Sequence, residues 1–205
     1  MRLLLAVVTA TAIAGAPSQI TGTPIEQKPA TPQQPRETPR PTVVSAEAQT
    51  LAEFNQRLKR YSELHKRLES TLPSRSADAD PTTIEAHQRG LEKLLKAERK
   101  DAKQGDIFTP TTRRVLRQLL AGVLGGGDGA ALKATIMDEN PGKITLAVNS
   151  RYPDDLPVST VPPQVLAALP KLPEELEYRF IGNRLILLDV HAYTVVDYMD
   201  NAFTM

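Results

Sequence analysis

Asp189 and His191 are the residues whose types and spacing best suit chemistry in this chain. They stand two positions apart at the end of an expected strand, so their side chains should point to the same side. A carboxylate that orients an imidazole forms the core of many general-base and metal sites. Asp197 and Asp200 follow in the next segment. We take Asp189 and His191 as weak catalytic candidates and expect both to be structural or solvated.

The other patterns associated with catalysis or binding fail on their spacing or context. Residues 125–130 contain the letters G-x-G-x-x-A of a dinucleotide-binding turn, but a helix is expected before them where a strand is required. The acidic pairs at 138–139 and 154–155 lack the ligand spacing of an EF-hand loop. The chain has neither a G-x-S-x-G elbow nor an H-E-x-x-H helix. From the sequence alone we therefore expect no cofactor and no metal ligands.

The composition argues against nucleic-acid binding. The formal net charge is +1, aromatic residues make up 4% of the chain, and tryptophan is absent. A nearly neutral chain has little attraction for a phosphate backbone, and few aromatic side chains leave little surface on which bases can stack. Cysteine is also absent, so the fold must be stable without disulfides.

The N-terminus predicts export from the cytoplasm. Met1 and Arg2 form a positive start, residues 3–13 are apolar, and Ala12-Ile13-Ala14 suits a signal peptidase. The apolar run is shorter than the roughly 20 residues that cross a bilayer, so we expect no transmembrane span in the mature form. We predict a signal peptide at residues 1–14 and a periplasmic or secreted protein.

Residues 15–44 are predicted to form a disordered linker. Prolines recur there among threonine, glutamine and serine. Such a segment has too little apolar surface to offset the entropy that ordering would cost. We therefore expect a single folded domain at residues 45–205, helical at 45–140 and rich in strands at 143–205.

Four helices are predicted in the first part of this domain. Ser45, Asp80 and Thr109 are suitable N-cap residues, and proline follows the last two at the first helical position. Gly105 is expected to end the second helix in a left-handed conformation. These signals place the helices at residues 45–72, 80–103, 109–125 and 128–140.

The first helix has an apolar stripe with the three- and four-residue steps of a heptad repeat. The stripe consists of Leu51, Phe54, Leu58, Tyr61, His65, Leu68 and Leu72. It would serve either as a surface for a protein partner, through Leu51, Phe54, Leu58, Tyr61 and Leu68, or as an internal packing surface. We favour internal packing, because the stripe has only the minimum length of a coiled coil and its flanking charges are mixed.

The end of the chain predicts an antiparallel sheet. Residues 177–181 and 184–190 flank Gly182-Asn183, a two-residue hairpin signal, and residues 193–198 supply a third strand. Leu185 to Leu188 are consecutive apolar residues, so the middle strand should be covered on both faces.

A further strand is expected where apolar residues alternate at 144–148, and a short helix at 163–169. The predicted fold class is therefore α+β, with a helical N-terminal half packed on a small antiparallel C-terminal sheet of three or four strands.

Two segments resemble a group of exported bacterial proteins of unknown function. They are residues 104–110, QGDIFTP, and residues 166–180, LAALPKLPEELEYRF. The similarity extends over residues 50–200. It implies the same order of signal peptide, tether, helices and C-terminal hairpin, and it implies no activity, cofactor or catalytic residue.

The function predicted from these observations is a non-enzymatic binding or assembly domain of the cell envelope. The alternative is a hydrolase or metal-dependent enzyme with a site near Asp189 and His191. A deep pocket that encloses Asp189 and His191 would favour the enzyme. An exposed apolar stripe would favour the binding domain.

Overall fold

The computed structural model describes residues 45–74, 76, 78–138, 144–154 and 161–204. They belong to one compact unit, Val43–Met205. The predicted signal peptide at 1–14 and linker at 15–44 lie outside the described residues. Within the described part of the chain, no helix combines the length and apolar character needed to span a membrane.

The fold is α+β, as predicted, with the helices first and a three-stranded sheet at the end of the chain. The N-caps form as expected: the Ser45 hydroxyl accepts a hydrogen bond from the Ala48 amide, and Asp80 and Thr109 cap the next two helices in the same way. The helices are α1 Ala46–Glu69, α2 Pro81–Glu98, α3 Pro110–Leu124, α4 Gly129–Asp138 and α5 Pro163–Ala168.

The second helix ends earlier than predicted, at Glu98 instead of Lys103. The backbone leaves the helical conformation at Arg99 (φ −104°, ψ 29°), where the carbonyl accepts a hydrogen bond from the Asn149 side chain. The Arg99 guanidinium donates to Asn149 Oδ1 (2.8 Å) and to the carbonyl of Val196 (3.0 Å). Gly105 does have a positive φ, 98°, but it lies in the loop after the helix.

The sheet consists of β1 Leu176–Ile181, β2 Arg184–Asp189 and β3 Thr194–Met199, all antiparallel in the order β1-β2-β3. The predicted hairpin is confirmed, since Ile181 pairs with Arg184 across a turn in which Gly182 has φ 57°. Both β2 faces are buried, also as predicted: Leu185 and Leu187 face one hydrophobic cluster, and Ile186 and Leu188 face the other.

The strand predicted at 144–148 is wrong. Residues 144–147 have no regular structure, and a turn follows in which Asn149 has φ 61°. The Asn149 side chain donates to the carbonyl of Arg99, and its backbone amide donates to the carbonyl of Val195. Ile144 and Leu146 still pack against the hydrophobic cluster that contains Ile186 and Leu188. Their apolar character is therefore explained by this packing, although the segment is irregular.

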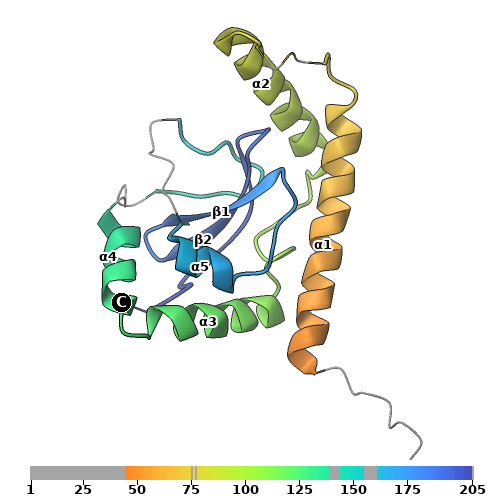
Figure 1. The fold of residues 1–205 in the computed structure, drawn as a ribbon. Helices are drawn as coiled ribbons and strands as arrows, with labels where there is room; N and C mark the ends of the chain where they lie inside the picture. The colour runs from red at the N-terminus through yellow and green to blue at the C-terminus, as the bar shows by residue number, and fades with distance from the viewer. Residues whose placement is uncertain (1–44, 75, 77, 139–143, 155–160, 205) are drawn as a thin grey trace, which may run out of the picture. The chain divides into compact units, whose positions relative to one another are not determined.

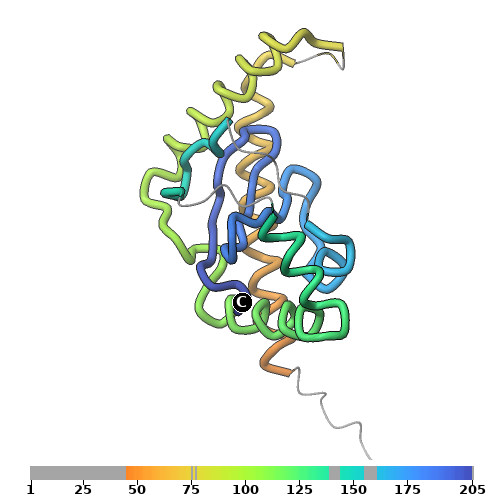
Figure 2. Tube along the Cα trace, turned by 90° about the vertical axis from the view of Figure 1, so that its left-hand side faces the viewer, coloured from red at the N-terminus to blue at the C-terminus, as the bar shows by residue number. Residues whose placement is uncertain are grey.

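The apolar stripe of α1 packs inside this domain. Phe54, Leu58, Tyr61 and Leu68 are buried in the same cluster as Leu185 and Leu187, whereas Leu51 is partly exposed. Figure 1 shows α1 beside the sheet, and α3 runs below the sheet toward the lower part of α1. In Figure 2, α1 passes behind the strands. The internal packing that we favoured is therefore the arrangement observed. A protein partner stays a prediction, and the four buried side chains are not on the surface to bind it.

Candidate metal centre

The sequence contains three histidines, and the structure brings all of them to one carboxylate, that of Glu69. His65 Nε2 lies 3.2 Å from Glu69 Oε2, and His191 Nδ1 lies 3.1 Å from Oε1. His87 Nε2 lies 3.4 Å from Oε1. The three imidazoles and the Glu69 carboxylate therefore form one cluster of titratable side chains.

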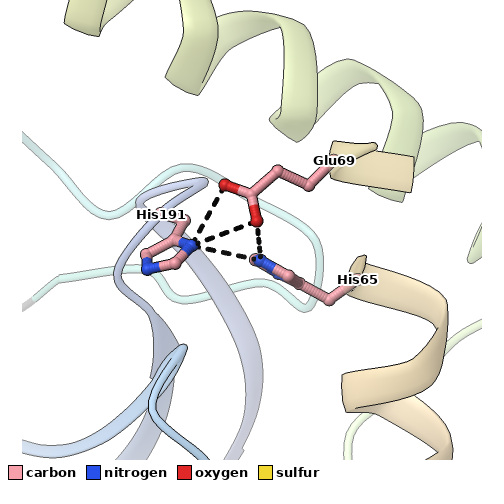
Figure 3. A group of neighbouring side chains, drawn as sticks. All are labelled: His65, Glu69 and His191. Atoms are coloured by element: carbon pink, nitrogen blue, oxygen red, sulfur yellow. Dashed lines mark hydrogen bonds and ion pairs between the residues drawn. The ribbon is translucent and has the colours of Figure 1, made fainter. Parts of the chain in front are cut away.

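Three elements position these side chains. His65 and Glu69 are four residues apart in the last turns of α1, so they share one face of the helix. His191 lies in the turn between β2 and β3, and His87 lies in α2. Figure 3 shows His65 and Glu69 reaching from α1 toward His191 on the opposite side of the cluster.

The donor atoms of His65, Glu69 and His191 form a nearly equilateral triangle, drawn with dashed lines in Figure 3. Its sides are 3.2 Å from His65 Nε2 to Glu69 Oε2, 3.3 Å from His65 Nε2 to His191 Nδ1, and 3.4 Å from His191 Nδ1 to Glu69 Oε2. Ligands about 2.1 Å from zinc at tetrahedral angles lie about 3.4 Å from one another. The triangle therefore has nearly the dimensions of one face of a tetrahedral zinc site.

Asp189 holds His65 from the side opposite this triangle. Its Oδ2 lies 2.6 Å from His65 Nδ1 and accepts a second hydrogen bond from the Tyr61 hydroxyl at 2.6 Å. Its Oδ1 accepts the backbone amides of His191 and Ala192. A proton on Nδ1 facing Asp189 leaves Nε2 of neutral His65 with its lone pair toward the triangle, as in carboxylate–histidine–zinc arrangements.

The electrostatics favour an anionic Glu69 and a positively polarised His65. Burial acts to raise the pKa of Glu69, but the charge of His191 and the hydrogen bond to His87 lower it overall. Burial acts to lower the pKa of His65, but the hydrogen bond to Asp189 and the charges of Asp189 and Glu69 raise it overall. The cluster thus concentrates negative charge around His65, which a bound cation would also neutralise.

A cavity of about 580 Å³ lies next to the cluster. Glu69 and His87 form part of its wall, so the carboxylate is in contact with both the triangle and the cavity. The side chains of Glu69 and His191 are 27% and 32% exposed, whereas that of His65 is 1% exposed. The triangle therefore has one buried corner and two corners that solvent reaches. The residues that line the cavity are Lys66, Glu69, Ser70, Leu72, Pro73, Ser74, Ser76 and His87.

Both sequence candidates lie in this cluster, in different roles. Asp189 is fully buried and structural, not solvated, and it bonds to the backbone amide of His191 instead of the imidazole. His191 supplies a side chain to the triangle. Asp197 points elsewhere and accepts the backbone amides of Gly105, Ile107 and Phe108. Asp200 pairs with Arg184.

The remaining sequence patterns have structural explanations where they fall within the described residues. The glycines at 125–127 follow the end of α3, with Gly125 as its C-cap. Asp138 is the last residue of α4, and Asp154 forms an ion pair with Arg151. The other residues of these two acidic pairs, 139 and 155, lie outside the described part of the chain.

Sequence reasoning missed His65, Glu69 and His87 as site residues. The i,i+4 spacing of His65 and Glu69 on a predicted helix was a usable signal for two ligands on one face. His65 was instead assigned to the apolar stripe, because its spacing from Tyr61 and Leu68 fits the heptad. No local pattern marks His87, which reaches the cluster only through the packing of α2 near α1.

No protein-family model, curated protein or solved structure matches this chain. The chemistry of the site must therefore be argued from its own geometry. Two imidazoles and one carboxylate form a donor set that zinc uses in catalytic sites and that iron(II) uses in facial triads. The same atoms, without an ion, form the hydrogen bonds described above.

Proposed function

We propose that this domain binds one divalent transition-metal ion, with zinc as the reference ion, through His65 Nε2, Glu69 Oε2 and His191 Nδ1. The observation that supports the proposal is the triangle of donor atoms, whose sides of 3.2–3.4 Å are close to the separations between ligands in a tetrahedral zinc site. Asp189 adds the outer carboxylate that commonly orients a metal-binding histidine.

The protonation states of the triangle also favour an ion. If His65 Nε2 and His191 Nδ1 both donate to Glu69, two N–H groups face each other across 3.3 Å. If either nitrogen is deprotonated, its lone pair points at the anionic carboxylate. A metal ion accepts both nitrogen lone pairs and the carboxylate together, so it removes this conflict.

The test is metal analysis of purified protein that has been stripped with a chelator and then dialysed against zinc. We expect about one zinc ion per chain. Glu69→Gln and His191→Gln should each lower the affinity by at least tenfold, because each removes one donor. Glu63→Gln is the matched control, since Glu63 lies on the same helix with its side chain 64% exposed. Substoichiometric zinc in the wild type, or equal affinity in His191→Gln, would contradict the proposal.

We also propose that the domain acts outside the cytoplasm, as a non-enzymatic binding or assembly domain of the cell envelope. The support is the predicted signal peptide at residues 1–14, together with a site in which Glu69 and His191 are accessible for reversible exchange of an ion. Intact-mass analysis of protein from the native host should find a chain that begins near Gly15 in the exported fraction. A soluble cytoplasmic form that keeps residues 1–14 would contradict it.

The alternative function, a hydrolase or metal-dependent enzyme near Asp189 and His191, is supported by the cavity beside Glu69. Catalytic zinc sites use three protein donors and leave one position for water. Zinc-loaded wild-type protein should then hydrolyse a chromogenic ester or phosphoester faster than the metal-free form. Equal rates for wild type and His191→Gln in the presence of zinc would leave metal binding as the function.

A further inference from the structure

The proposed metal centre lies next to a cavity. Three donors come from the protein, and a tetrahedral ion takes four, so one position is left for a ligand from solution. His65 is buried and backed by Asp189, which closes that side. Glu69 belongs both to the triangle and to the wall of the cavity of about 580 Å³, so the cavity adjoins the centre at Glu69.

The polar groups of this cavity suit an anion. Among the residues that line it, Lys66 carries a fixed positive charge and Ser74 and Ser76 carry hydroxyls, whereas the Ser70 hydroxyl already donates to the carbonyl of Arg67. Among the lining residues in the described part of the chain, Glu69 is the only carboxylate, and in the proposed centre its charge would be neutralised by the metal. Hydroxyls and an ammonium group donate hydrogen bonds, and anionic oxygens accept them.

Lys66 has a free charge in this position. Two other basic residues of α1 form ion pairs, Lys59 with Glu63 and Arg67 with Glu98. Lys66 has no ion-pair partner among the residues that the structure describes. It lies three residues before Glu69 on the same helix, so both side chains reach the same part of the surface.

We propose that the cavity admits a small ligand with an anionic oxygen group, a carboxylate or a phosphate, which completes the coordination of the metal and is paired by Lys66. This inference rests on the proposed metal site. The cavity volume lies within the range of sites that bind small molecules. Leu72 and Pro73 in its wall would contact the apolar part of such a ligand.

The test uses cobalt(II) in place of zinc, because the visible spectrum of cobalt changes when its ligands change. Cobalt-loaded protein is titrated separately with acetate and with inorganic phosphate. We expect a saturable spectral change with at least one of them, and the comparison tells which anion the centre prefers. Lys66→Gln should weaken that binding by about tenfold. Lys59→Gln, the same substitution at an earlier position on α1, should leave the affinity for the anion unchanged.

The outcomes separate the two proposals. If cobalt binds stoichiometrically but neither anion changes its spectrum, the metal site stands and this inference is overturned. An anion response that Lys66→Gln does not weaken overturns the role of Lys66 and of the cavity. If cobalt does not bind, the metal site and the inference both fail.

Discussion

Asp189 shows how strongly one residue depends on its partners. Its carboxylate is fully buried and accepts hydrogen bonds from the Tyr61 hydroxyl, the His65 imidazole and two backbone amides. A buried charge is stable only when such donors surround it. The Asp189 side chain, which we expected to be structural or solvated, is therefore structural and links α1 to the turn between β2 and β3.

Asp189→Asn should lower the free energy of unfolding by about 2 to 4 kcal/mol. The amide group of asparagine would face donors where the carboxylate accepted, and a buried polar group would lose its partner. Chemical denaturation measures the loss. Asp200→Asn is the matched control, because the Asp200 side chain is 51% exposed and should contribute less than about 1 kcal/mol. Equal effects of the two substitutions would contradict the buried network.

Tyr178 should make the fold sensitive to alkali. Burial raises the pKa of its hydroxyl, which donates to the carbonyl of Pro170 at 3.1 Å. In the unfolded chain the pKa is about 10, so above that pH the unfolded state loses a proton that the folded state keeps. The stability contributed by the neutral hydroxyl is thus complete below about pH 10 and is lost as the pH rises toward the folded pKa.

Denaturation at a series of alkaline pH values measures this dependence. Stability should fall as the pH rises above about 10, and the slope should be shallower in Tyr178→Phe, which has no hydroxyl to titrate at that position. An identical slope in wild type and variant would show that Tyr178 ionises freely in the folded protein.

At the scale of elements, α1 combines two tasks on one face. Its stripe fills the core with Phe54, Leu58 and Tyr61, and the same line of residues continues into His65. The packing of Phe54, Leu58 and Tyr61 in the core therefore fixes the position of His65. Because the stripe is covered within the domain, its contribution to stability does not require a second chain.

Leu58→Ala should cost about 2 to 4 kcal/mol of unfolding free energy, because it removes a buried side chain and leaves a cavity. Leu166→Ala is the control, since Leu166 on α5 is 50% exposed and should contribute little. The melting temperature of the wild type should also be the same at low and high protein concentration. A marked rise with concentration would instead indicate that α1 packs on a partner chain.

At the scale of the domain, the proposed ion would connect the end of α1 to the turn between β2 and β3. Segments far apart in the chain supply the ligands, so the complete set exists only in the folded state. An ion that binds the folded state alone raises its stability by mass action. Metal binding and global stability are therefore expected to change together.

Zinc at roughly a hundred times its dissociation constant should raise the free energy of unfolding by about 2.7 kcal/mol. Denaturation with excess zinc and with a chelator measures the difference. His191→Gln, with at least tenfold weaker binding, should keep at most about 1.4 kcal/mol of this gain at the same zinc concentration. It should leave the chelated protein nearly as stable as the wild type, because His191 is partly exposed in a turn. Stabilisation of the same size in His191→Gln would place the ion elsewhere.

The amino-acid sequence by itself determined the features that depend on neighbouring residues. The helices begin after Ser45, Asp80 and Thr109, because each of these side chains accepts a hydrogen bond from the backbone amide three residues later. The turn at Gly182 pairs β1 with β2, and this pairing also depends only on residues that are close in the sequence. The run from Leu185 to Leu188 predicts a strand that is buried on both faces. These signals were enough for the α+β class.

The tertiary structure alone decided where α2 ends, why residues 144–147 form no strand, and which side chains form the cluster. Arg99 and Asn149 bond to each other over a separation of 50 residues, and no local pattern encodes that contact. His65 and Glu69 meet His191 across more than 120 residues of chain. Periodicity shows which side of an element a residue occupies, but only the packing of α1 against the sheet determines which side chain it meets there.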